Sequence, residues 1–141
     1  MATDRRSDLR WMDRAECFAV LARDCVGRLG ITDGRTPMIV PVNYALDGED
    51  IVFRTDPGTK LEIGPRARAC FEIDEIDRST RTGWSVLATG RLEEVTHYDA
   101  AAWDRIATLG IEPWASGPKQ HVLRLVPERL TGRRIARTSA G

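Results

Sequence analysis

The sequence predicts a mainly β (α+β) fold, an antiparallel barrel of six to seven strands with peripheral helices. Short apolar runs that alternate with polar residues recur along the chain, and turn-forming Gly, Pro and Asp residues separate them. Helical periodicity is confined to one segment before the strands and one inserted late, unlike the alternation of a βαβ fold. The glycine patterns of Rossmann and P-loop proteins are absent. A length of 141 residues fits one domain over residues 1–141.

The N-terminal region divides into an arm and a helix. Residues 1–11 lack periodicity and are predicted to form a mobile N-terminal arm, although its Leu and Trp side chains could fold back onto the body. Asp13, followed three residues later by Glu16, matches a capping box. The apolar stripe behind this cap predicts a helix over residues 14–24.

The next part of the chain predicts three strands joined by tight turns. Residues 25–32 have strand character. Two further strands, over residues 38–44 and 51–55, flank an Asp-Gly pair at positions 47–48, which supplies the positive φ angles of a hairpin turn. Pro41 cannot donate to a sheet ladder and therefore belongs at an edge or a bulge. Such a position leaves neighbouring backbone groups free to face a ligand.

A candidate phosphate site follows this hairpin. In residues 56–60, Asp-Pro-Gly-Thr-Lys, backbone N–H groups, a hydroxyl and the ammonium of Lys60 converge directly after Arg54 and Thr55. Such a nest suits a dianionic phosphate. From these residues alone, a polar turn after an exposed strand is the favoured interpretation.

The second half of the chain predicts the remaining elements. Strands are expected over residues 67–76 and 83–92, a helix over 98–109, and two closing strands over 120–126 and 130–135. Trp84 in the second of these strands is either a core residue or the wall of a site for a planar ligand.

Candidate acid–base and metal-binding residues are few. For Glu72, Asp74, Glu75 and Asp77 a solvated strand face and turn is favoured over an acid–base or metal site, because no histidine is nearby. Arg28 is interpreted as an exposed strand residue, with a ligand contact as the alternative. The two histidines lack ligand spacing to each other or to a cysteine, which argues against a metal site or a Ser-His-Asp system. The sequence therefore names no catalytic residue, and catalysis requires a cofactor with its own reactivity.

The charge and the cysteine content limit the possible partners and the cellular compartment of the protein. The 21 basic and 21 acidic side chains cancel, so no overall field favours nucleic acid or an anionic membrane. Four arginines within residues 129–137 form a local patch without an aromatic stacking platform, which leaves nucleic-acid binding the weaker hypothesis. Three widely spaced cysteines favour buried free thiols, and the charged N-terminus lacks the apolar core of a signal or membrane span. The predicted location is the cytoplasm.

Five motifs in order resemble a known family. The strands VPVNY and IVFRT, the loop PGTKL and the segments FEID and GWSVLATGRLEEV are similar to those of the FMN-binding split-barrel family related to pyridoxamine 5′-phosphate oxidase, specifically its small oxidase-like flavoproteins of actinobacteria. The resemblance runs over residues 13–134. It implies a split barrel, an FMN cofactor and a homodimer with two flavins at its interface.

The resemblance also implies the cofactor-binding residues, which lie in three segments. They are Val40, Pro41, Val42 and Asn43; Arg54, Thr55, Lys60 and Leu61; Trp84 and Ser85. The first segment presents backbone and side chains to the isoalloxazine ring, and the second holds the ribityl chain and phosphate. The third contacts the flavin from the same barrel or from the partner subunit.

The expected function is that of an FMN-dependent oxidoreductase, which transfers a hydride to or from a small substrate or oxygen. Two basic signatures of the oxidase proper are missing, which argues against pyridoxamine phosphate oxidation. Arg133 and Arg134, in place of one signature, are either a basic wall or a surface strand end. One alternative replaces FMN by the deazaflavin coenzyme F-420, and another is a protein that binds a flavin or haem without turnover.

Overall fold

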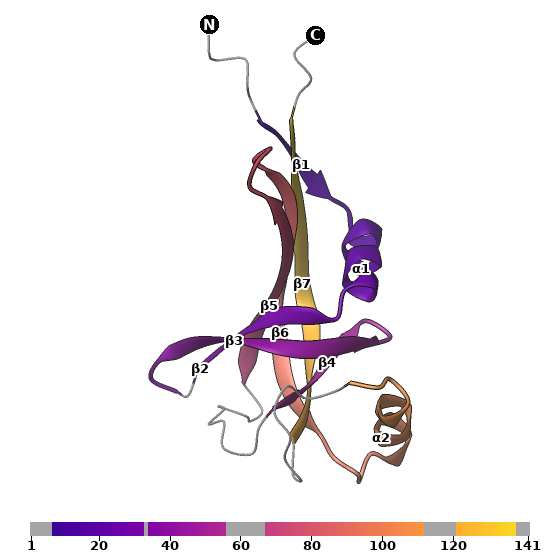
Figure 1. Cartoon of the computed structure of the whole chain (residues 1–141). Coiled ribbons are helices and arrows are strands. Elements are labelled where there is room, and N and C mark those ends of the chain that lie inside the picture. The colour runs from indigo at the N-terminus through magenta and orange to yellow at the C-terminus, as the bar shows by residue number, and fades with distance from the viewer. Residues whose placement is uncertain (1–6, 33, 56–66, 112–120, 138–141) are drawn as a thin grey trace, which may run out of the picture.

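A computed structural model describes residues 7–32, 34–55, 67–111 and 121–137, which form seven strands and two helices (Figure 1). In chain order these are β1 Ser7–Met12, α1 Arg14–Arg23, β2 Val26–Thr32, β3 Pro37–Asp47, β4 Asp50–Thr55, β5 Arg68–Asp77, β6 Thr82–Val95, α2 Ala100–Ala107 and β7 His121–Arg137. The two helices confirm the predicted helical segments; α1 ends one residue earlier than predicted, and α2 is two residues shorter at each end.

Six of the strands close into an antiparallel barrel. The order is β7-β4-β3-β2-β5-β6, and pairing of β6 with β7 completes the circle. Closure removes most free strand edges, which would otherwise pair with other chains. The mainly β fold, a barrel with peripheral helices, is confirmed.

The seventh strand, β1, corrects the expectation of a mobile arm over residues 1–11. Residues 7–12 pair antiparallel with β7, from Ser7 opposite Arg137 to Met12 opposite Gly132. The ladder to β4 uses only the first part of β7, through Leu125. The later part of the same edge is therefore open to β1, whose short polar–apolar pattern was too weak to predict a strand by itself.

A long extension rises from the barrel. We call it the tongue; it consists of β1 with residues 72–77 of β5, 82–87 of β6 and 131–137 of β7. Figure 1 shows these ribbons continuing past the crossing strands β2 and β3. The tongue carries one group of predicted site residues away from the others.

A bulge keeps β7 continuous, where the sequence predicted two strands. The register with β6 steps from Thr89 opposite Arg129 to Gly90 opposite Pro127, so Glu128 is the extra residue. Proline lacks the N–H that a regular ladder needs, and a bulge accommodates this loss without ending the strand.

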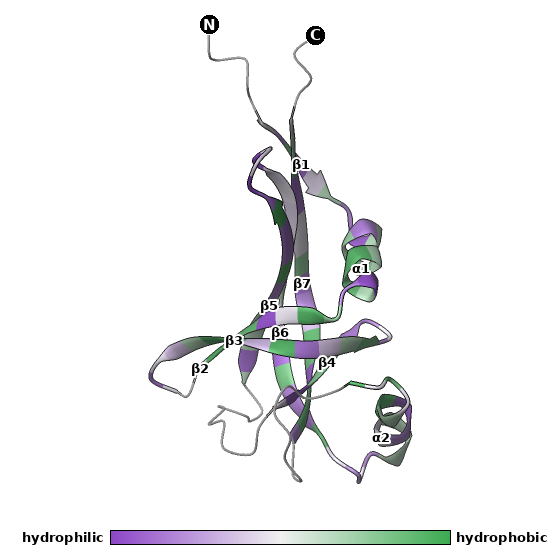
Figure 2. Ribbon diagram, viewed as in Figure 1, coloured by the Kyte–Doolittle hydropathy of each residue, from purple (hydrophilic) through white to green (hydrophobic). Residues whose placement is uncertain are grey.

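The main core lies inside the barrel and includes Cys17, Val20 and Leu21 of α1, whereas α2 packs on a separate cluster. The ring of Tyr44 packs edge-on against Phe71 at a centroid distance of 4.8 Å, and its hydroxyl donates to the Leu21 carbonyl of α1 at 2.6 Å. Helix α1 begins as predicted, because the Asp13 carboxylate accepts from the Glu16 N–H at 2.8 Å. Helix α2 packs on a second apolar cluster, formed by Val52, Val95, Ala102, Ile106, Ile111 and Val122. Figure 2 shows the mixed hydropathy expected of helices with one buried side.

The three cysteines differ in burial, although the sequence predicted that all would be buried. All three cysteines are free, and Cys17 is buried, but Cys25 is exposed and Cys70 half-buried. The prediction of buried thiols is therefore wrong for Cys25, which follows α1 at the barrel surface. Neither of the helices in the described ranges is long and apolar enough to span a membrane.

Candidate functional site

The β3–β4 hairpin contains most of the predicted flavin-binding residues. Its turn lies one position later than the Asp-Gly pattern suggested: Asp47 pairs with Asp50, which leaves Gly48 and Glu49 as the two central residues. Gly48 has φ +62°, a value that glycine adopts without the strain of a Cβ atom. The hairpin is confirmed, and its short ladder ends at Tyr44 opposite Phe53.

Beyond this point β3 and β4 separate, which gives the barrel an open edge. Residues 37–43 of β3 pair with β2 on one side, whereas the described ladder to β4 covers only residues 44–47. Among the described residues, the β4 ladder therefore stops before residues 37–42, and no described strand pairs with that side of β3 there. We call the space between this part of β3 and the end of β4 the split.

The four β3 residues of the predicted site divide between the two faces of the strand. Val42 is buried and Val40 packs against the core cluster, so both side chains face the barrel interior. Pro41 is exposed and Asn43 half-buried, as the alternation of a strand requires. The two valines therefore offer no side chain to a ligand on the outside, and their backbone lies in the β2 ladder, while Pro41 and Asn43 can present side chains.

At the end of β4, two buried polar atoms lack a partner. Arg54 Nε and Thr55 Oγ1 are the only side-chain polar atoms of this kind in the described part of the chain. Thr55 is 7% exposed and is the one polar residue among the buried residues described. Buried polar groups are nearly always hydrogen-bonded, and an unmade bond costs about 1–3 kcal/mol. Two adjacent exceptions make the end of β4 a candidate site for a ligand with hydrogen-bond acceptors.

The chemistry of this pair fits a phosphate. A guanidinium N–H and a hydroxyl can both donate to phosphate oxygens in charge-assisted hydrogen bonds. His121, opposite Thr55 across the sheet, already contacts Glu94, with Nδ1 and Oε1 2.8 Å apart. The predicted Lys60 and Leu61 lie outside the described residues. The structure thus gives two of the four implied residues of this segment a feature that suits the role.

Trp84 and Ser85 lie far from this pair in the same chain. Arg54 is opposite Val122 on β7, and Trp84 is opposite Arg134, twelve positions further along the same strand. At the usual rise of a strand this separation is about 40 Å. A single chain therefore does not bring the third predicted segment to the split.

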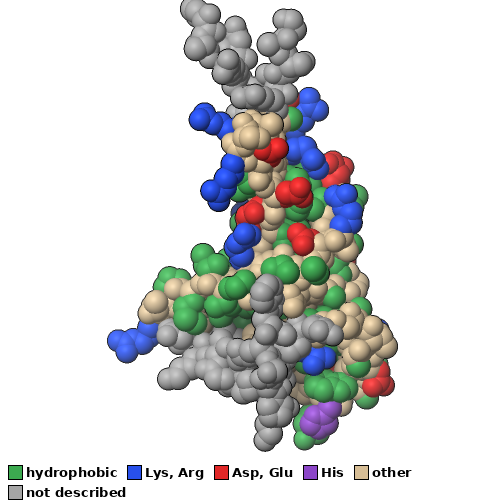
Figure 3. All heavy atoms as spheres, viewed as in Figure 1, with side chains coloured by type: hydrophobic (Ala, Val, Ile, Leu, Met, Phe, Trp, Pro, Cys, Tyr) green, Lys and Arg blue, Asp and Glu red, His purple; other side chains and the backbone are tan. Residues whose placement is uncertain are grey.

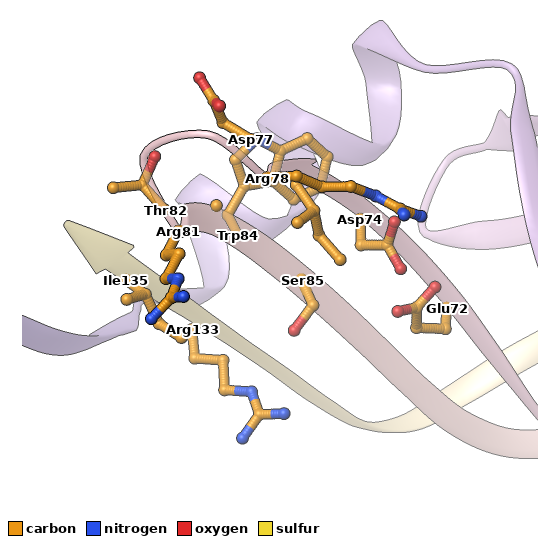
Figure 4. Close-up of a pocket in the computed structure, with 12 residues that line it drawn as sticks. Glu72, Asp74, Asp77, Arg78, Arg81, Thr82, Trp84, Ser85, Arg133 and Ile135 are labelled. Carbon is orange, nitrogen blue, oxygen red and sulfur yellow. The ribbon is translucent and has the colours of Figure 1, made fainter. Parts of the chain in front are cut away.

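The tongue instead places Trp84 and Ser85 at a separate pocket, with a volume of about 490 Å³, and Trp84 also packs against the core cluster. We call it the tongue pocket; it is lined by Glu72, Asp74, Ile76, Asp77, Arg78, Arg81, Thr82, Gly83, Trp84, Ser85, Arg133 and Ile135 (Figure 4). Arg133, which sequence reasoning left open between a basic wall and a strand end, forms part of this wall.

Two carboxylates of the tongue pocket share one arginine. Arg28 Nη1 lies 3.1 Å from Glu72 Oε1 and 3.3 Å from Asp74 Oδ2. Burial raises the pKa of Glu72 to about 7, and the hydrogen bond and negative charge of Asp74 act in the same direction, against the Arg28 guanidinium. The interpretation of a solvated acidic face is therefore incomplete. The sequence did not reveal this contact, because it depends on the pairing of β2 with β5, which sets Arg28 opposite Glu72.

Several apolar side chains, here called the apolar strip, are exposed on the outer sheet face, and one of them, Ile76, lines the tongue pocket. Its members alternate with polar residues and are strongly exposed: Leu9 at 50%, Trp11 at 71%, Ile39 at 76%, Ile76 at 66% and Leu87 at 43%. In Figure 3, hydrophobic side chains gather over β2 and β3, and charged side chains of both signs flank the tongue. Exposed apolar side chains that gather on one face can form an interaction site.

Comparison with known proteins gives the family. The model of the pyridoxamine 5′-phosphate oxidase family matches residues 13–134. An uncharacterized protein of Mycobacterium tuberculosis is 32% identical over 135 residues, which are 91% of this chain and 86% of that protein.

Two solved structures with similar folds are flavin-binding proteins. The FAD-binding protein of Mycobacterium smegmatis superimposes with a TM-score of 0.72 at 30% identity, over 89% of this chain and 96% of that chain. An FAD-binding protein of Mesorhizobium loti gives 0.74 at 25% identity, over 93% of this chain and 99% of that chain. Because the family model covers most of the sequence and the fold agrees, this chain belongs to the pyridoxamine 5′-phosphate oxidase family.

Proposed function

We propose that the protein is a flavin-dependent oxidoreductase that binds FMN in the split and transfers a hydride to or from a small substrate. The observation that carries the proposal is the pair of buried, unpartnered donors, Arg54 Nε and Thr55 Oγ1. They lie at two positions where the family resemblance implies contacts to the ribityl chain and phosphate. The two FAD-binding relatives support a flavin as the ligand class.

The residues of the split would bind and orient the cofactor. Arg54 and Thr55, on opposite faces of β4 at its end, would reach the ribityl chain and the phosphate. Lys60 and Leu61 are further contacts expected from the resemblance. Backbone groups on the β4 side of β3 near Pro41 would hydrogen-bond the ring edge, because the described β4 ladder ends at Tyr44. When bound, the flavin supplies the redox reactivity that the protein's own side chains lack.

A homodimer is part of this proposal. Trp84 and Ser85 are too far from Arg54 in one chain to share its flavin. A second subunit, docked through the apolar strip, would bring its tongue to the split of the first. Each flavin would then lie between the split of one chain and the tongue of its partner.

The cofactor assignment is tested by the absorbance spectrum of the purified protein and mass spectrometry of the released chromophore. FMN is the expected mass. FAD, as in the two relatives named above, would keep the phosphate site but change the cofactor. A deazaflavin band or a Soret band would replace the flavin proposal by one of its alternatives. A colourless protein that binds none of these in titration would refute it.

Turnover is tested separately from binding. Hydride transfer predicts that the bound flavin is bleached by a reductant and recovers its colour when oxygen or another acceptor is added. A protein that holds an oxidised flavin without reacting with any of several reductants would instead be a flavin carrier.

Sharing of the site between subunits is tested with mixed dimers. One chain carries Arg54→Ala and the other Trp84→Ala, and the two are co-expressed with different affinity tags. If each site uses one split and one partner tongue, the mixed dimer has one intact site and binds one flavin. If both residues act within one chain, every site of the mixed dimer is defective and no flavin binds.

A further inference from the structure

We propose that the tongue pocket binds a small organic anion, a compound with a phosphate or carboxylate group on an apolar body. We further infer that this anion is the substrate, a step that rests on the proposed flavin function. Anion binding itself does not depend on the flavin.

The acidic side chains of the pocket are already engaged within the protein. Arg28 bridges Glu72 and Asp74. Asp77 accepts hydrogen bonds from the Ser79 N–H at 3.0 Å, the Ser79 hydroxyl at 2.7 Å and the Thr80 N–H at 3.2 Å. Arg28 cancels one of the two charges of Glu72 and Asp74, and the partners of Asp77 are neutral, so the carboxylates keep part of their negative charge.

The basic side chains of the pocket, in contrast, lack partners among the described residues. Within the described residues, Arg78, Arg81 and Arg133 make no ion pair and no side-chain hydrogen bond, although all three line the pocket. In Figure 4, Arg81 and Arg133 lie at one end of the pocket, and Glu72 and Asp74 lie at the other. Counting Arg28, four arginines face three carboxylates, which leaves a balance of one positive charge, and Arg81 and Arg133 lie away from Glu72 and Asp74.

The backbone at Arg81 is also unusual. Its φ is +58°, the only positive value at a described non-glycine residue. A residue other than glycine is strained in this region, and such strain tends to occur at ligand-binding sites. The conformation keeps a long cationic side chain at the turn between β5 and β6, where glycine would be the easier residue.

The remaining lining defines the body of the ligand. Ile76, Trp84 and Ile135 contribute apolar surface next to the arginines. A volume of about 490 Å³ lies within the range of small-molecule sites. Because Trp84 and Ser85 also belong to this pocket, a ligand here would lie beside the flavin of the partner subunit in the proposed dimer.

Calorimetric titration with four probes of similar shape tests the charge preference. Phenyl phosphate and benzoate carry an anion on an aromatic ring, benzamide is neutral and benzamidine is a cation. The protein as purified is expected to bind the two anions, with affinity that falls as salt is raised, and to bind benzamide and benzamidine at least tenfold more weakly. Tighter binding of phenyl phosphate would indicate a phosphorylated substrate, and tighter binding of benzoate a carboxylate.

A matched pair of double variants tests the site. The double variant Arg81→Gln with Arg133→Gln is expected to bind the two anions at least tenfold more weakly, because two charge-assisted contacts are lost. Arg23→Gln with Arg129→Gln removes the same charge from exposed positions outside the pocket lining and should leave affinity within twofold. Equal affinities for both double variants, or a preference for benzamidine, would overturn the proposal.

Failure of this inference and failure of the flavin proposal give different results. Arg54→Met should lose FMN yet keep anion binding, because the split and the tongue pocket are separate within a chain. If the protein holds no flavin but binds anions through Arg81 and Arg133, anion binding in the pocket is supported and the inference that the anion is the substrate is refuted. If it binds FMN but no anion, only the pocket inference fails.

Discussion

The split and the tongue pocket both contain polar groups without a partner, but these groups are buried in the split and exposed in the pocket. In the split, Arg54 Nε and Thr55 Oγ1 are buried, whereas Arg81 and Arg133 of the tongue pocket are exposed. An unpaired buried donor lowers the stability of the ligand-free protein, since water cannot replace the missing partner. An exposed arginine stays hydrated and has little effect on stability. Mutations in the split should therefore change both folding and binding, whereas mutations in the pocket should change binding alone.

The largest expected effect is the loss of FMN affinity when Arg54 of the split is replaced. Arg54→Met keeps much of the side-chain length and removes the guanidinium, so a charge-assisted contact to the FMN phosphate is lost. FMN affinity should fall by about 10- to 100-fold, since hydrogen bonds to charged groups contribute about 1.5–3 kcal/mol. Fluorescence titration of FMN measures the change. Arg23→Met, on the exposed side of α1, is the control, and equal affinity of the two variants would remove Arg54 from the site.

A structural residue on the same hairpin should behave differently. Tyr44→Phe removes the hydroxyl that donates to Leu21 O, and this leaves a buried carbonyl without its partner. The free energy of unfolding should drop by about 1–3 kcal/mol, while FMN affinity stays within twofold. Urea unfolding and FMN titration measure the two quantities. A large loss of FMN affinity with unchanged stability would place Tyr44 in the binding site instead.

Thr55→Val is expected to move stability and binding in opposite directions. The substitution replaces a buried hydroxyl that has no partner, so the ligand-free protein should gain about 1 kcal/mol, whereas FMN binds more weakly. Thermal unfolding without FMN, followed by titration, measures both effects. Thr131→Val on the tongue is the control, and its stability should change by less than about 0.5 kcal/mol. A destabilised Thr55→Val variant would show that the hydroxyl has a partner within the protein.

The smallest expected effect concerns the pH dependence that Glu72 gives to stability. Its pKa is raised from 4.5 to about 7 in the folded protein. The folded chain therefore keeps a proton that the unfolded chain releases, and this contribution to stability is present below pH 4.5 and is lost as pH rises through 7. Asp74 and Arg28 face the same carboxyl and set the size of the effect.

Glu72→Gln should flatten this dependence. Urea unfolding of the variant and the wild type at about pH 5 and about pH 8 measures it, and the wild type should lose more stability over this interval. Glu75→Gln, on the opposite face of β5, serves as the control. Parallel pH profiles for the wild type and the Glu72 variant would show that the carboxyl ionises as in the unfolded chain.

Local sequence patterns predicted most of the elements. The capping box at Asp13 placed the start of α1, and the turn-forming pair near Gly48 placed the β3–β4 hairpin to within one residue. The patterns failed where pairing outweighed local preference. Residues 7–12 form a strand because β7 offers a free edge, and β7 continues past Pro127 because a bulge absorbs the proline.

The candidate site shows the same division. The family resemblance named Arg54 and Thr55, and the structure gave both a buried atom without a partner. No pattern in the sequence paired Arg28 with Glu72, because that contact joins residues 44 positions apart. Nor did it separate Trp84 from Arg54, since their distance depends on how far the tongue extends along β7.

The sequence by itself determined the barrel class, the helix caps, the hairpin and the family, because capping, turn formation and strand alternation act over a few residues. Only the tertiary structure decided which polar groups are paired. It engaged the carboxylates of the tongue pocket, left its arginines without partners and buried two donors at the split. Partners and burial depend on strand register between distant segments, and register is fixed only when the whole sheet closes.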